Sequence, residues 1–166
     1  MLRISKITDY GIVLLTELAR GGMGEPHNAR ELSKTAQLPL PVVSKTLKAL
    51  TRRGLLVSHR GSKGGFNLAR EPEQIAVAEV IEALEGPVGI TECSVAVGEC
   101  TREAICGVRE PWQHINSVIL QALRQVTLAD LISRPRDLIE FDLISRPHEL
   151  IDLDLIRHPG AGAKPH

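Results

Sequence analysis

The chain has 166 residues, enough for one well-buried domain with an appended tail, and only four of them are aromatic, so its core must be aliphatic. Its net charge is zero, yet residues 1–70 carry twelve Lys and Arg against four Asp and Glu, whereas residues 71–166 carry eight against sixteen, so the first part suits a polyanionic partner. No apolar run approaches the roughly 18 residues of a membrane span, and the N-terminus lacks the apolar stretch of a secretory signal, so we expect a cytoplasmic protein without a membrane partner.

Three amphipathic helices are predicted in the basic part. Apolar residues recur at helical spacing between residues 4 and 20, and a stretch rich in glycine then breaks the pattern. Asn28 is placed to cap a short second helix. Pro41 and Gly54 mark the beginning and the end of a third helix.

The third predicted helix has a polar and basic outer face. Two helices joined by a tight turn, the second with such a face, form the helix-turn-helix that enters a DNA major groove. Arg30 on the preceding helix extends the basic surface. The candidate DNA-contacting residues on the third helix are Ser44, Lys45, Lys48 and Arg52.

A β-hairpin is predicted after the third helix. Two short apolar runs, at residues 55–57 and 66–68, flank a glycine-rich centre with Arg60 and Lys63, whose basic tip suits the minor groove or the phosphates. A helix-turn-helix followed by a hairpin is a winged helix, so we expect a mainly α fold with one small β-hairpin. The alternatives are a protein-binding winged helix and a basic surface that is merely solvated.

An amphipathic linking helix is predicted at residues 71–86, ended by a Gly-Pro pair. We therefore assign residues 1–86 to a winged helix-turn-helix DNA-binding domain that includes this linking helix. We expect the residues after 86 to have a role other than DNA binding, because their charge balance is acidic.

All three cysteines, Cys93, Cys100 and Cys106, lie within fourteen residues. In a reducing cytosol an odd number of clustered thiols indicates metal binding or redox sensing rather than structural disulfides. Their spacing is wide for a zinc knuckle. Three thiolates on a loop suit an iron-sulfur cluster, which takes four ligands and tolerates one that is not cysteine. We assign residues 87–109 to a cluster-binding loop.

A longer helix is predicted over residues 110–131, where apolar residues beginning with Trp112 and Ile115 recur in alternating steps of three and four. We expect residues 110–130 to be the dimerisation helix of a homodimer, because a winged helix that reads a long site usually works in pairs. The alternative is packing on the protein's own core.

Residues 131–166 contain an internal repeat with a period of twelve, which places Pro135, Pro147 and Pro159 in register. Prolines at this interval prevent a continuous helix, and each unit is too short to bury a face. We expect a disordered or extended tail, with a partner-binding linear motif as the alternative.

The order of these motifs resembles that of a known family, the IscR and NsrR type of winged-helix iron-sulfur regulators, and above all the regulators of the SUF cluster-assembly operon. The resemblance covers roughly residues 1–130, through SKITDYGIVLL, VSKTLKALTRRGLLVSHRGSKGGFNLA, IAVAEVIEALEG and the cysteine loop. It implies a homodimeric bacterial transcription factor whose 2Fe-2S or 4Fe-4S cluster changes its affinity for double-stranded operator DNA, and we expect this factor to be a repressor. It also implies that Arg60 reaches the minor groove and that Ser44, Lys45 and Lys48 lie near bases or backbone.

The chain departs from the family pattern at two points. Six residues separate its first two cysteines, where members of the family have five, and Arg109 stands where the IscR branch has a ligand histidine. The NsrR branch takes its fourth ligand from an aspartate in the first helix of the other subunit, and Asp9 matches that position. Asp9 is therefore the implied fourth ligand. Its alternative role is that of a first-turn helix carboxylate, and His114 is a weaker ligand candidate.

The sequence predicts a DNA-binding regulator rather than an enzyme, because no catalytic motif is recognised and the histidines are scattered. One alternative is a regulator that senses nitric oxide or the thiol-disulfide state of its cysteines. Another is an iron-sulfur carrier or interaction protein with a vestigial winged helix. Salt-dependent, site-specific DNA binding separates the regulator from the carrier.

Overall fold

A computed structural model of the chain describes residues 3–22, 24, 26–61, 64–95, 98 and 100–133. The expected tail is thus described only as far as residue 133, and Lys63 lies outside the described residues. The described part is mainly helical with one small antiparallel hairpin, as the sequence predicts. Its first elements are α1 (Lys6–Arg20), α2 (Ala29–Thr35), α3 (Leu40–Arg52), β1 (Leu56–His59), β2 (Gly65–Leu68) and the 3-10 helix η1 (Pro72–Gln74). They are followed by α4 (Val77–Glu85), α5 (Glu92–Val95), the 3-10 helix η2 (Glu103–Ile105), α6 (Arg109–Gln125) and α7 (Leu128–Ile132).

The first three helices begin at the capping signals of the sequence. The Ser5 side chain accepts a backbone hydrogen bond in the first turn of α1. Asn28 and Glu31 form a reciprocal capping box at the start of α2. α3 has Pro41 in its first turn, and Gly54 follows it in a left-handed conformation with φ of +74°.

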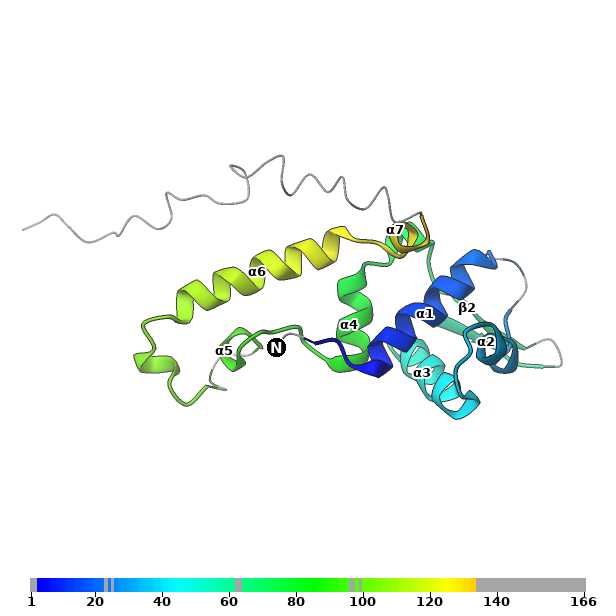
Figure 1. Ribbon diagram of the computed structural model, residues 1–166, viewed down its shortest axis with the longest axis horizontal. Coiled ribbons are helices and arrows are strands. Elements are labelled where there is room, and N and C mark those ends of the chain that lie inside the picture. The colour runs from blue at the N-terminus through cyan, green and yellow to red at the C-terminus, as the bar shows by residue number, and fades with distance from the viewer. Residues whose placement is uncertain are drawn as a thin grey trace, which may run out of the picture. The chain divides into compact units, whose positions relative to one another are not determined.

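The core is aliphatic, as the scarcity of aromatic residues requires. Leu14 and Leu15 of α1 and Leu47 and Leu50 of α3 have no exposed surface. Leu128 of α7 joins the same cluster with 1% of its surface exposed. Figure 1 shows α1 lying between the helix-turn-helix and α4, with the end of the described chain returning to it through α7.

The hairpin is held against the segment that precedes α2. β1 and β2 pair antiparallel with Leu56 opposite Leu68. His27 pairs with Phe66 through two backbone hydrogen bonds of 3.1 and 2.9 Å between nitrogen and oxygen. A Cβ on Gly65 would lie 2.6 Å from the His27 carbonyl oxygen, so glycine permits this close approach.

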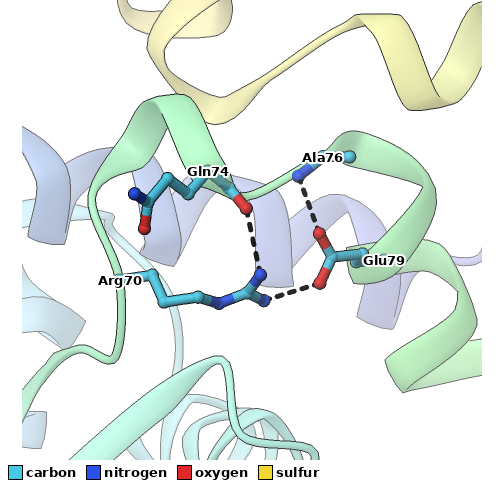
Figure 2. A network of polar contacts seen from close by, with 4 residues as sticks. All are labelled: Arg70, Gln74, Ala76 and Glu79. Carbon is cyan, nitrogen blue, oxygen red and sulfur yellow. Dashed lines mark hydrogen bonds and ion pairs between the residues drawn. The ribbon is translucent and has the colours of Figure 1, made fainter.

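The predicted linking helix is divided in two. η1 occupies the first part of residues 71–86, and α4 begins only at Val77. The Arg70 guanidinium stabilises this break, as Figure 2 shows, by donating to the Gln74 carbonyl oxygen at 3.0 Å and to Glu79 Oε2 at 2.6 Å. The second carboxylate oxygen of Glu79 accepts the Ala76 N–H at 3.3 Å, which caps α4. The Arg70 hydrogen bond is also the main cause of the lowered pKa of Glu79.

The predicted helix over residues 110–131 is likewise two helices. α6 ends at Gln125, and Thr127 caps α7 by accepting the Asp130 N–H at 3.2 Å while the Asp130 carboxylate accepts the Thr127 N–H at 2.7 Å. This reciprocal capping box stabilises the start of a separate helix. No helix in the described residues is long and apolar enough to cross a membrane.

A short backbone bridge joins the break after α6 to the break before α4. The Val77 N–H donates to the Val126 carbonyl oxygen at 2.9 Å, and the Leu128 N–H donates to the Ile75 carbonyl oxygen at 2.8 Å. We call these two hydrogen bonds the 75–128 bridge. The backbone groups at the break before α4 and at the break after α6 are hydrogen-bonded to each other, so each break depends on the other.

Candidate functional site

The structure separates the two faces of α3 as the sequence predicts. Val43 has no exposed surface, and Leu47 and Leu50 pack beside it on the inner face. The outer face carries the candidate DNA-contacting side chains. Lys45, Lys48 and Arg52 are exposed there, and Ser44 is half-buried.

The basic side chains of α3 are available to a ligand. In the part of the chain that the structure describes, the ion pairs are Arg20 with Glu17 and Arg70 with Glu79. No described carboxylate therefore neutralises Lys45 or the other basic residues on the outer face of α3. An unneutralised cationic face on a helix of this kind suits phosphate contacts.

The remaining basic candidates flank α3. Arg30 is exposed on α2, and Arg60 is exposed directly after β1. The pairing of His27 with Phe66 fixes the hairpin, whose first strand directly precedes Arg60, to the segment before α2. This pairing could not be predicted from the sequence, because neither the residue types nor their spacing indicates it.

The three thiols occupy different settings on the loop after α4. Cys93 lies in α5 and is 9% exposed, whereas Cys100 and Cys106 are half-buried. None of the three forms a disulfide. η2 lies between Cys100 and Cys106 and gives that part of the loop a regular turn.

Two polar side chains of α6 hold the start of the cysteine loop. Asn116 Oδ1 accepts the Ile90 N–H at 3.1 Å, and Asn116 Nδ2 donates to the Val88 carbonyl oxygen at 3.4 Å. One turn earlier, Gln113 Nε2 donates to the Cys93 carbonyl oxygen at 3.2 Å. Neither residue was predicted from the sequence. The available signal was a pair of amides three positions apart, which places them on the same face of α6.

A hydroxyl group contacts the most buried of the three sulfurs. Thr91 directly precedes α5, and its Oγ1 lies 3.3 Å from Cys93 Sγ and 2.7 Å from Ser94 Oγ. The Ser94 N–H also donates to the Thr91 carbonyl oxygen at 2.9 Å, which fixes Thr91 against the turn.

A cavity of about 500 Å³ opens beside the last cysteine. It is lined by Cys106, Gly107, Arg109, Glu110 and Gln113. Gln113 also bonds to the Cys93 backbone, so this space lies next to the segments that carry two of the three thiols.

The thiols suit an iron-sulfur cluster by their chemistry, because three soft sulfur ligands on one loop supply all but one of the ligands that a cluster requires. The described residues do not, however, bring the three thiols together. Among the described residues, no three His, Cys, Asp or Glu side chains form a group that could hold a metal ion. Asp9 is exposed in the first turn of α1.

The beginning of α1 is tied to the end of α4, directly before the cysteine loop. Glu85 Oε1 accepts the Ser5 N–H at 2.8 Å. Hydrogen bonds from the Thr8 side chain and then from Ser5 lower the pKa of Glu85. This contact could not be predicted from the sequence, because Ser5 and Glu85 are 80 positions apart in the chain.

Comparison with known proteins agrees with this architecture. The Rrf2 family model, described as an iron-dependent transcriptional regulator, matches residues 4–134. The HTH-type transcriptional regulator NsrR of Bacillus subtilis is 27% identical over 140 residues, which cover 84% of this chain and 96% of NsrR.

Two solved structures share the fold. CymR, the global cysteine regulator of B. subtilis, is 30% identical with a TM-score of 0.64, over 80% of this chain and 98% of CymR. T. potens IscR is 27% identical with a TM-score of 0.61, over 79% of this chain and 86% of IscR. The predicted winged-helix fold and the resemblance to the IscR and NsrR type of regulator are thereby confirmed. The relatives are regulators of transcription rather than enzymes, and the chain belongs to the Rrf2 family of transcriptional regulators.

Proposed function

We propose that the chain is a homodimeric repressor whose affinity for operator DNA depends on an iron-sulfur cluster, of the 2Fe-2S or 4Fe-4S type, and that it controls genes of cluster assembly. Cys93, Cys100 and Cys106 would hold the cluster, with Asp9 of a second subunit as the fourth ligand. The observation that carries the proposal is the placement of every thiol of the chain on one loop that follows α4 and is hydrogen-bonded to α6.

The proposal assigns a separate role to each of three regions of the chain. Residues 1–86 bind DNA, residues 87–109 hold the cluster and residues 110–130 carry the subunit contacts. Lys45, Lys48 and Arg52 contact phosphates while Ser44 lies near a base edge. Arg30, Arg60 and Lys63 add contacts beside α3 and in the minor groove.

A subunit contact along α6 is supported by exposed apolar surface. Trp112 is 40% exposed and Ile115 is 44% exposed, and both lie on the helix that the sequence marks as a packing seam. Val108 at the start of the same helix is 55% exposed. A second copy of α6 would cover this surface and bring two copies of α3 to one operator.

A bound cluster would supply a redox-sensitive connection among the three thiolates. The chain's own residues transmit a change in the loop. Gln113 and Asn116 fix the start of the loop to α6, and Glu85, the last residue of α4, is hydrogen-bonded to Ser5 at the start of α1. A coupling free energy of about 1–3 kcal/mol is enough to change the affinity for the operator by about 5- to 150-fold.

The first test is anaerobic purification followed by an absorption spectrum and iron and sulfide analysis. We expect a coloured protein with matching iron and sulfide, and a Cys100→Ala variant that folds but binds no cluster. Thr101→Ala, one position along the same loop, is the matched control and should keep the cluster. A Cys100→Ala variant with full iron and sulfide content would contradict the ligand assignment.

The second test measures operator binding by fluorescence anisotropy at several salt concentrations. A regulator that contacts several phosphates loses affinity steeply as salt rises, and it prefers its operator to unrelated DNA. A cluster carrier would show neither property. Equal, salt-independent binding to both DNAs would exclude the regulator.

A thiol switch is the second candidate, favoured by the absence of a closed metal group among the described residues. Cys100 and Cys106 are free and half-buried. An oxidant such as a peroxide would accept two electrons from the two thiols, their sulfurs would form one S–S bond and their two protons would leave. A colourless protein after reconstitution, together with a mass decrease of two hydrogen atoms on oxidation, would support this function over the cluster.

A further inference from the structure

The Thr91 hydroxyl is the one described side-chain hydroxyl that contacts a cysteine sulfur. Its oxygen lies 3.3 Å from Cys93 Sγ, within the range of an O–H to sulfur hydrogen bond. Cys93 is 9% exposed, so water competes little for this contact. The Thr91 oxygen is also 2.7 Å from the Ser94 hydroxyl.

The chemistry of a ligand thiolate sets the direction of these two hydrogen bonds. A thiolate has no proton, so Thr91 must donate to Cys93 Sγ. The single Thr91 hydrogen is then used, and Ser94 must donate to Thr91 Oγ1. The result is a chain of hydrogen bonds from Ser94 through Thr91 to the sulfur, in which each bond polarises the next.

We propose that Thr91 is a positioning residue that raises the reduction potential of the cluster by donating a hydrogen bond to the Cys93 thiolate. The inference rests on the proposed function. Reduction adds one electron and therefore negative charge to the cluster and its ligands. A donor aimed at a ligand sulfur stabilises this reduced state more than the oxidised state.

The effect should be specific to Cys93. Thr101 stands next to Cys100 in the same loop, but its residue is exposed and its hydroxyl has no hydrogen bond to any described residue. The chain thus offers a threonine of the same loop, beside another proposed ligand, that lacks the contact to sulfur.

The test is an anaerobic redox titration of the cluster-loaded, full-length protein, monitored by absorption. Thr91→Val keeps the shape and removes the hydroxyl, so its midpoint potential should be lower than that of the wild type. Thr91→Ser restores the donor and should restore the potential. Ser94→Ala should lower it by less than Thr91→Val, and Thr101→Val should leave it unchanged.

Several results would decide against the inference. Equal midpoint potentials for wild type and Thr91→Val overturn it, as does an equal decrease in Thr101→Val. Loss of iron and sulfide from both Thr91→Val and Thr91→Ser would show that Thr91 acts through packing, and it also overturns the inference. Loss from Thr91→Val alone supports the hydrogen bond from the Thr91 hydroxyl to the Cys93 thiolate. A wild-type chain that binds no iron and sulfide after reconstitution overturns the proposed function itself.

Discussion

Asn116 shows how a single amide can organise a loop. It is 4% exposed, and its side chain satisfies one backbone donor and one backbone acceptor at the start of the cysteine loop. A buried peptide group that loses its partner costs more than the hydrogen bond itself contributes, since it is cut off from water as well. The loop therefore depends on this residue even though Asn116 is not a proposed ligand.

We expect Asn116→Ala to lower the free energy of unfolding by about 1–3 kcal/mol, because it leaves the Ile90 N–H and the Val88 carbonyl unpaired. The measurement is urea unfolding followed by circular dichroism. Ser117→Ala is the control, because Ser117 is exposed and its hydroxyl donates only to its own helix, to the His114 carbonyl oxygen at 2.7 Å. Equal midpoints for the two variants would contradict the role of Asn116.

Lys48 allows a test of DNA contact at one residue. It is exposed on α3, and no described carboxylate pairs with it. If it contacts a phosphate, Lys48→Ala should weaken binding about equally on all DNA sequences and reduce the slope of log affinity against log salt by about 1. Arg124→Ala, at the exposed end of α6, is the matched control and should leave the slope unchanged. An unchanged slope for Lys48→Ala would remove Lys48 from the interface.

At the scale of the elements, the contact between α4 and α1 has a pH dependence. The pKa of Glu85 is lowered from its ordinary value of 4.5, first by the Thr8 side chain and then by Ser5. A carboxylate with a lowered pKa stabilises the fold at pH values above 4.5, and this contribution is lost as the pH falls through the folded pKa. The wild type should therefore lose more stability below pH 4.5 than Glu85→Gln loses.

The measurement is the thermal midpoint of both proteins as a function of pH. Glu82→Gln is the control, because Glu82 lies on α4 and its side chain has no hydrogen bond to any described residue. Its acid dependence should parallel that of the wild type. Parallel curves for wild type and Glu85→Gln would mean that Glu85 does not hold the start of α1.

The elements that the sequence predicts correctly are those defined by local signals. Asn28 and Pro41 each lie within a few residues of the helix start that they predict, because helix starts are set by local signals. The breaks at Ile75 and Val126 were missed because the hydrogen bonds that join them span about fifty positions, and because the local capping pair of Thr127 and Asp130 lies within a continuing apolar pattern. Apolar periodicity continues across both breaks and contains no information about the 75–128 bridge.

The same distinction applies to the candidate site. The cysteines are recognisable by residue type, and the exposed lysines of α3 by helical period. Gln113 acts on a residue 20 positions away and Glu85 on one 80 positions away, so their roles depend on the folded arrangement. The proposed grouping of Asp9 with the thiols would require a second subunit, which one sequence does not place.

At the scale of the whole described part, Leu128 connects the end of α6 to the DNA-binding core. It is 1% exposed and belongs to the cluster that contains Leu14 and Leu47. Leu128→Ala should lower the free energy of unfolding by about 2–5 kcal/mol, because it removes buried methyl groups and leaves a cavity. Val57→Ala, at a residue that is 44% exposed on β1, is the control and should cost far less. Similar losses in urea unfolding would show that α7 does not belong to the core.

The 75–128 bridge makes a closed ring of the segment that contains α4, the cysteine loop and α6. Its two ends are fastened to each other and, through Leu128, to the winged helix. A change of length confined to the cysteine loop leaves both hydrogen bonds of the bridge in place, because neither of them involves a residue of that loop. The loop can in this sense differ in length or in its side chains while the two ends of the ring stay joined.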